Sequence, residues 1–253
     1  MSHSVTCYAS RNKPKSRLLS EAFAQGCNGT VVIGPQGLAP GLAAFYGVQS
    51  DTLRAFNAAR ARGGFYYIDN AYAGTGFRIT RDRLQHSGIG EGDRERFRRL
   101  GVPIKPWRKS GSHVLVCPPG DYFMSMTGQP WTADEWLART LDTLTASTDR
   151  PIRVRHKPAV KRGFAPLAAD LADCWALVTH MSATAIEAVL SGVPAFVSRH
   201  SAAAPVSATD LTTIETPRAD GDREAWAAVL AANQWSIDEI RNGIAWERLN
   251  GAH

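Results

Sequence analysis

Small hydroxyl residues, a glutamate and a glycine–proline pair follow one another in the segment from Thr179 to Pro194. Ser182 and Thr184 stand where an expected strand gives way to a helix, and the free backbone N–H groups of a first helical turn bind phosphate. Glu187 follows one turn later, where a carboxylate can accept hydrogen bonds from ribose hydroxyls. A capped helix of an ordinary α/β domain is the alternative interpretation, because serine and threonine are common capping residues.

A second set of polar residues lies in the segment from Ile152 to Pro158. Arg153 and Arg155 alternate along an expected strand, so their side chains share one face and can hold one phosphate or a diphosphate together. His156 and Lys157 follow at the strand end. A lone histidine is more often a surface or core residue, but these cationic neighbours favour anion binding.

Asp69 ends an expected strand, 65–69, that is rich in aromatic residues. A carboxylate at the end of a buried strand is costly unless it has partners, and it lies where a sheet usually binds its ligand. We therefore predict that Asp69 is a general base that accepts the proton of an acceptor hydroxyl. A structural carboxylate that binds loop amides is the alternative role, and His86, in a glycine-rich loop, is the alternative base.

The stretch 74–109 holds few aliphatic residues and many arginines, with Phe77, Phe97 and Trp107 between them. Such a stretch can bind a polyanion, because arginines pair with phosphates and aromatic rings stack on bases. A solvated charged surface is the alternative. The candidate acceptor-binding residues are Gln36, Tyr72, Arg78, Arg81, Arg94, Arg98 and Arg99.

Elements that would position these residues alternate along most of the chain. Apolar runs predict strands at 5–9, 30–33, 43–48, 65–69, 113–117, 152–155, 175–179 and 193–197. Amphipathic segments predict helices at 15–25, 51–62, 132–147, 167–171, 183–190, 222–232 and 236–243. This alternation predicts an α/β fold of parallel βαβ units. The stretch 74–109 is expected to be a long excursion that leads to a domain boundary.

The expected architecture is two compact Rossmann-like lobes with a cleft between them. The first, 1–110, would bind the acceptor and the second, 111–253, the nucleotide, with a return of the last helix to the first lobe left open. The sequence has 29 lysines and arginines against 23 aspartates and glutamates, a formal net charge of +6. This excess indicates an anionic partner without specifying which.

Several function classes lose their simplest support. The sequence contains no P-loop, GxGxxG, GxSxG or HExxH motif, which disfavours kinases, dehydrogenases, hydrolases and metalloproteases. The cysteines are far apart and form no metal-ligand pair. No apolar run approaches the roughly 20 residues of a membrane span. We therefore expect a soluble cytoplasmic protein of unknown oligomeric state.

The residues 182–194, SATAIEAVLSGVP, resemble the donor-site helix of GT-B glycosyltransferases, especially the capsule-type and sialyl-type branch. The segment 152–158, IRVRHKP, is similar to the His-Pro motif of the same families, with Lys157 inserted between histidine and proline. The resemblance implies that His156, Ser182 and Thr184 bind the donor phosphate and Glu187 the ribose. It also implies a nucleotide-sugar co-substrate, such as a UDP- or CMP-sugar, with no metal and no cofactor.

The segments 66–72, 78–88 and 233–240 are similar to small phage-encoded glycosyltransferases. With the basic charge, this favours DNA as the acceptor, at a hydroxylated or hydroxymethylated base that a duplex would have to flip out. A capsule or lipopolysaccharide sugar transferase is the alternative enzyme. A non-catalytic nucleic-acid-binding α/β protein is the alternative outside enzymes.

Overall fold

The computed structural model describes residues 4–157 and 165–251. Its internal contacts divide the chain into two compact units. The first unit joins Met1–Leu84 to Asn233–His253, and the second is Gln85–Ala232. The C-terminal segment therefore belongs to the first unit.

The division after Leu84 differs from the boundary near residue 110 that the sequence suggested. The reason is that the intervening segment packs on the second unit. The Gln85 side chain donates a hydrogen bond to the Met181 carbonyl and accepts one from the Ala202 N–H. Further along, the Lys105 N–H donates to Leu190 O at 2.8 Å.

The sheet of the first unit has the strand order β10-β5-β4-β3-β1-β2. Its strands are β1 (Val5–Ala9), β2 (Thr30–Ile33), β3 (Leu42–Tyr46), β4 (Phe65–Asn70), β5 (Phe77–Arg81) and β10 (Gln234–Trp235). The strands β1 to β4 pair in parallel, and β5 and β10 are antiparallel to their neighbours. The parallel strands confirm the βαβ pattern that the sequence predicted for this region.

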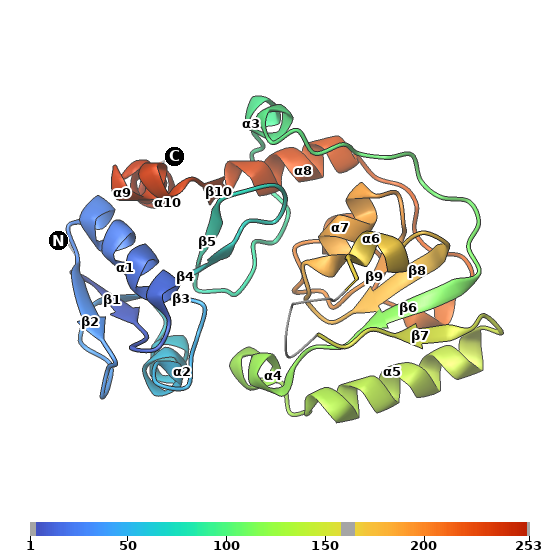
Figure 1. Ribbon diagram of the computed structural model, residues 1–253, viewed down its shortest axis with the longest axis horizontal. Helices are drawn as coiled ribbons and strands as arrows, with labels where there is room; N and C mark the ends of the chain where they lie inside the picture. Colours follow the sequence, from blue (N-terminus) through green and yellow to red (C-terminus); the bar gives the residue numbers. More distant parts are fainter. Residues whose placement is uncertain (1–3, 158–164, 252–253) are drawn as a thin grey trace. The chain divides into compact units, whose positions relative to one another are not determined.

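Helices cover both faces of this sheet (Figure 1). On one face, α1 (Pro14–Cys27) packs with α9 (Ile237–Arg241) and α10 (Ile244–Asn250) over the buried strand residues. On the other face, the Phe56 ring of α2 (Leu53–Arg62) contacts the rings of Phe45 and Phe65. This core holds the carboxyl ends of β1, β3 and β4 in fixed register.

Strand β5 lies inside the stretch that the sequence analysis treated as an excursion, so that expectation was wrong for these residues. The strand pairs with β4 along five residues and with β10 through Gln234 opposite Arg78. The apolar pattern of the sequence did not indicate this strand, because one of its buried residues is an arginine. Arg78, at 6% exposure, is buried through an ion pair rather than through apolar packing.

The second unit contains a four-stranded parallel sheet in the order β7-β6-β8-β9. Its strands are β6 (His113–Cys117), β7 (Ile152–Val154), β8 (Cys174–Thr179) and β9 (Ala195–Phe196). Its α-helices are α3 (Arg94–Arg99), α4 (Asp121–Thr127), α5 (Ala133–Ser147), α6 (Leu167–Asp170), α7 (Thr184–Leu190) and α8 (Arg223–Ala232). Short 3₁₀ turns lie at Ala204–Val206 and Leu211–Thr213.

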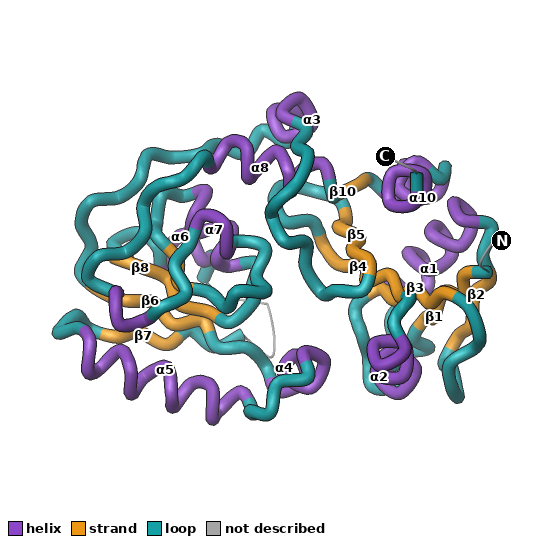
Figure 2. Tube along the Cα trace, turned by 180° about the vertical axis from the view of Figure 1, so that it is seen from behind, coloured by secondary structure: helices purple, strands orange, loops and turns teal. Residues whose placement is uncertain are grey.

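Figure 2 shows α5 on one face of this sheet and α6 and α7 on the other. Val116 and Val178 pack with Leu144 of α5, so the intervening residues of β6 and β8 face α7. Helix α5 begins with the predicted cap, since the Thr132 and Glu135 side chains bond each other's backbone N–H groups. Because the four strands are parallel, their carboxyl ends all lie at the same edge of the sheet.

In the two described stretches, no helix combines the length and apolar character needed to cross a membrane. The four cysteines are free thiols; Cys27 is partly buried and the others are buried.

Candidate functional site

The carboxyl edge of the second unit's sheet brings the two predicted motifs together. Arg155 follows β7, Ser182 and Thr184 follow β8, and Ser198 follows β9. Open α/β sheets bind their ligands in the crevice outside the carboxyl ends of the strands.

Three side-chain atoms at this edge are buried and have no hydrogen-bond partner among the described residues. They are His180 Nε2, Thr184 Oγ1 and Ser198 Oγ. A buried polar atom left unpaired costs about 1–3 kcal/mol. Three such atoms on neighbouring strand ends therefore form a set that the polar groups of a ligand would satisfy.

Helix α7 begins at Thr184, with Ala183 as its N-cap, and Ser182 lies before the helix. The Ser182 hydroxyl accepts the Thr184 N–H at 3.3 Å. The Thr184 hydroxyl faces the Cys117 thiol, and burial raises the pKa of that thiol to about 11. The thiol therefore stays protonated near neutral pH and is a weak partner.

Arg155 is fixed by the strand end and by α6. Its N–H donates to Val116 O at 2.8 Å, and its guanidinium pairs with the Asp170 carboxylate and donates to Ala165 O at 2.6 Å. Arg153 is exposed. Burial lowers the pKa of His113, and the nearby charge of Arg153 lowers it further. Arg155 therefore pairs with Asp170. The sequence had predicted instead that Arg153 and Arg155 together hold a phosphate.

Glu187 lies on the exposed side of α7. Partial burial of the carboxyl raises its pKa, and the charge of Arg155 opposes this rise. Cys117 interacts electrostatically with both residues and with Asp170. The structure therefore brings together Arg155, Thr184 and Glu187, which the sequence analysis assigned to donor binding.

His180 is a site residue that the sequence analysis did not select. It is buried, its ring lies 6.3 Å from that of Trp136, and burial followed by the nearby charge of His200 lowers its pKa. The ring is therefore neutral at pH 7. In the sequence, only its position directly after Thr179, at the end of an expected strand, indicates that His180 could belong to the site.

The His-Pro-like motif is described only in part. His156 and Lys157 are exposed and follow Arg155 at the end of β7. Pro158, which completes the motif, lies outside the described residues.

In the first unit, Asp69 near the end of β4 forms an ion pair with Arg78 of β5, at 2.7 Å. Asp69 Oδ1 also accepts the Asn70 N–H at 2.8 Å. Arg78 donates to Asn70 O at 2.8 Å, and its guanidinium lies 4.9 Å from the centre of the Tyr72 ring. Both carboxylate oxygens of Asp69 are thus already hydrogen-bonded, although 29% of the side chain is exposed.

The alternative base, His86, belongs to the second unit, where its Nδ1 accepts the Gly88 N–H at 3.1 Å.

The remaining acceptor candidates are spread over different surroundings. Arg81 lies over the Tyr66 ring at 5.9 Å, whereas Arg94 pairs with Asp222 and Glu224 and Arg98 pairs with Glu95. Gln36 and Arg99 are exposed. With Arg78 buried, these arginines do not form one unpaired basic stripe.

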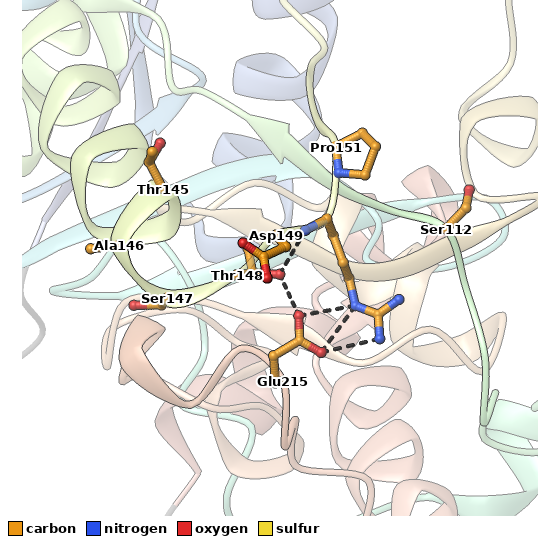
Figure 3. A pocket seen from close by; sticks show the side chains of 9 residues that line it. Ser112, Thr145, Ala146, Ser147, Thr148, Asp149, Pro151 and Glu215 are labelled. Atoms are coloured by element: carbon orange, nitrogen blue, oxygen red, sulfur yellow. Dashed lines mark hydrogen bonds and ion pairs between the residues drawn. The ribbon is translucent and has the colours of Figure 1, made fainter.

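A cavity of about 680 Å³ opens at the opposite, amino-terminal edge of the second unit's sheet (Figure 3). Arg150 and Glu215 line it and pair with each other at 3.1 Å, and the Arg150 guanidinium also lies 4.1 Å from the Trp175 ring centre. Arg150 and Glu215 therefore already have partners. We place the candidate site at the carboxyl edge instead, where buried polar atoms lack them.

Over the described residues, no three histidine, cysteine, aspartate or glutamate side chains gather as metal ligands would.

No protein-family model matches the chain, and no curated protein matches its sequence. A search of solved structures finds KpsC of Thermosulfurimonas dismutans, a beta Kdo 2,4 transferase. The TM-score is 0.52 at 15% identity, over 90% of each chain. The chain is similar to KpsC in fold. At this identity the likeness concerns the fold alone.

Proposed function

We propose that the protein is a GT-B-type glycosyltransferase that moves a sugar from a nucleotide-sugar donor to an acceptor hydroxyl. The observation that supports this most is the set of unpaired polar atoms of His180, Thr184 and Ser198 at the carboxyl edge of a parallel sheet. Cationic residues adjoin this set after β7. The fold likeness to a Kdo transferase agrees with the proposal.

In this proposal the second unit binds the donor. The cations of Arg155 and Lys157 would stabilise the charge that develops on the leaving phosphate. His156 would bind the same phosphate, and Arg153 would add to the positive field. The hydroxyls of Ser182 and Thr184 would donate hydrogen bonds to phosphate oxygens, and Glu187 would accept them from the ribose. Positioned cations and donors can supply most of the catalysis in such a transfer. We therefore propose a reaction that uses no metal.

The first unit would bind the acceptor, with Asp69 as the base. An ionised carboxylate oxygen accepts more than one hydrogen bond, so the contacts to Arg78 and the Asn70 N–H leave capacity for an acceptor hydroxyl. Arg78 would then hold Asp69 in place rather than bind a phosphate. Tyr72, whose ring stacks on Arg78, would line the same edge.

We favour a glycan of the capsule or lipopolysaccharide type as the acceptor over a modified DNA base. A DNA track needs arginines that are free to pair with successive phosphates. Arg94 and Arg98 instead pair with acidic neighbours, and Arg78 is internal. Weak DNA binding that stays unchanged in an Arg94→Gln, Arg98→Gln, Arg99→Gln variant would agree with this choice, and loss of tight binding in that variant would restore DNA as the acceptor.

Nucleotide binding to a Ser182→Ala, Thr184→Ala double variant tests the donor site. Calorimetry with CMP, UDP and GDP should show binding to the native protein and about 5–150-fold weaker binding to the variant, since lost hydrogen bonds to phosphate cost about 1–3 kcal/mol. Ser147→Ala is the matched control, because this serine lines the cavity at the other edge of the same unit. Equal affinity in a folded double variant would refute the donor site, and no nucleotide binding to the native protein would refute the function.

A further inference from the structure

Helix α1 begins with cations at the end where helices usually carry anions. Lys13 is its N-cap and Lys15 lies in its first turn, which contains no acidic residue. The amino-terminal end of a helix has a partial positive charge, so cations there are unfavourable. Arg17, one turn on, pairs with Glu21 at 2.7 Å, whereas neither lysine forms an ion pair with any residue that the structure describes.

The two lysines converge on the same aromatic ring. Lys13 Nζ lies 5.7 Å and Lys15 Nζ lies 5.5 Å from the centre of the Tyr46 ring. Lys15 Nζ also donates to Asn70 Oδ1 at 2.7 Å, and the Tyr46 hydroxyl donates to the same oxygen at 3.3 Å. These contacts hold two like charges near each other.

Two carboxylates, those of Asp69 and Asp51, belong to the same edge of the sheet as these lysines. Asp69, which interacts electrostatically with Tyr46, pairs with Arg78. Asp51, just before the next helix, accepts the Arg11 N–H at 2.8 Å through Oδ2, and its Oδ1 is buried with no hydrogen-bond partner among the described residues. The cations at this edge are Arg11, Lys13, Lys15 and Arg78 and the carboxylates are Asp51 and Asp69, so the formal charges leave an excess of two positive charges.

The lysines also lie where a sheet of this topology binds ligands. The strand order reverses at β1, which has β2 on one side and β3 on the other. In open α/β sheets the ligand crevice lies outside the carboxyl ends at such a reversal. Lys13 and Lys15 follow β1, Tyr46 ends β3 and Asn70 ends β4.

We propose that Lys13 and Lys15, held by Tyr46 and Asn70, form a binding site for an anionic group of the acceptor, a carboxylate or a phosphate. Describing the ligand as the acceptor rests on the proposed function; the anion site itself does not. The two ammonium groups supply six N–H donors, of which one contacts Asn70, and the others are available to anion oxygens. The acceptor would therefore be an acidic or phosphorylated glycan.

NMR titration of the full chain tests this site with three probes: trigalacturonate, inorganic phosphate and the neutral galactotriose. Trigalacturonate or phosphate should shift the amide signals of residues 10–13, 15–16, 46–49 and 70–72 at low salt, and galactotriose should not. In a Lys13→Gln, Lys15→Gln variant, affinity for the anion should fall about tenfold or more, because charge-assisted hydrogen bonds are lost. Arg17→Gln is the matched control on the same helix and should keep its affinity within about twofold, as expected for an exposed paired charge.

Binding of trigalacturonate without phosphate would assign the site to acidic sugars, and binding of phosphate alone would assign it to a phosphorylated group; both support the anion site. Absence of both, shifts confined to other residues, or equal binding of galactotriose would overturn it. The shift map of the native protein distinguishes these outcomes even where the double variant does not fold. Nucleotide binding is measured in the same samples. Retained nucleotide binding with no anion binding refutes this inference alone, whereas loss of nucleotide binding in the native protein refutes the proposed function.

Discussion

Some side chains at the carboxyl edge of β8 are buried and carry polar atoms that have no hydrogen-bond partner among the described residues. His180 is 5% exposed, its pKa is lowered by burial and by His200, and its Nε2 has no partner among the described residues. Such groups reduce stability and are retained where they serve binding. The pH dependence of stability follows from the same feature.

We expect the free energy of unfolding to fall as the pH drops below about 6.5, the ordinary pKa of histidine. The folded-state pKa of His180 is lowered, so the unfolded chain binds the proton more readily and acid favours unfolding. A His180→Gln variant should lose part of this dependence between pH 7 and 5 in urea unfolding. His113, whose pKa is also lowered, accounts for a remaining part. An unchanged slope in His180→Gln would show that His180 does not titrate in this way.

Asp69→Asn should lower turnover about 10²–10⁴-fold, the range for a lost general base. Nucleotide affinity should stay the same, because the proposed donor residues belong to the other unit. The assay is nucleotide release from the donor in the presence of acceptor, after circular dichroism has shown that the variant folds. Asp82→Asn is the control, since this carboxylate accepts the N–H groups of Gly64 and Phe65 and pairs with Arg81 at 3.8 Å, but does not contact Arg78. Normal turnover in Asp69→Asn would leave Asp69 a structural role and direct the search to His86.

Among the elements, α1 and β5 show most clearly how local preference and function diverge. Acidic residues stabilise the first turn of a helix, yet α1 begins with Lys13 and Lys15. Strand β5 carries the apolar Phe77 and Ile79 on alternate positions, but the intervening Arg78 is buried as well and pairs with Asp69. Both departures gather charge at the carboxyl edge of the first unit's sheet.

Removing the two cations should stabilise the unliganded protein. Each of Lys13→Gln and Lys15→Gln relieves an unfavourable charge at the start of α1, worth about 0.3–1 kcal/mol. The melting temperature should rise by about 2–4 °C for each kcal/mol in a chain of this size. Scanning calorimetry in low salt measures it, and the gain should shrink at high salt because charges are screened. A fall in melting temperature would mean that the lysines stabilise the helix through Tyr46 instead.

The two units are linked by a chain that leaves the first unit and returns to it. The returning segment adds β10 to the edge of the sheet beside β5, and Trp235 is 2% exposed in the core beneath α1. The stability of the first unit therefore depends on residues at both ends of the sequence.

Trp235→Ala should destabilise the first unit by about 3–5 kcal/mol, the cost of deleting a buried aromatic side chain. Hydrogen exchange should rise in β5, α1 and α9, whereas the sheet of the second unit should exchange as before. Nucleotide binding should persist, because His180, Thr184 and Ser198 lie in the other unit. Uniformly faster exchange in both sheets would show instead that the two units unfold as one.

Local pattern alone predicted most strands and helices, since apolar alternation, capping residues and glycine stops act within a few residues. It also placed Ser182, Thr184 and Glu187 after a strand end, as the structure has them. Pairings between distant residues have no local signal. The tertiary structure therefore decided that β10 joins β5, that residues 85–112 pack on the second unit, and that Asp69 meets Arg78. It also decided which polar atoms stay unpaired at the edge of β8, because burial and hydrogen-bond geometry arise only when strands far apart in the chain come together.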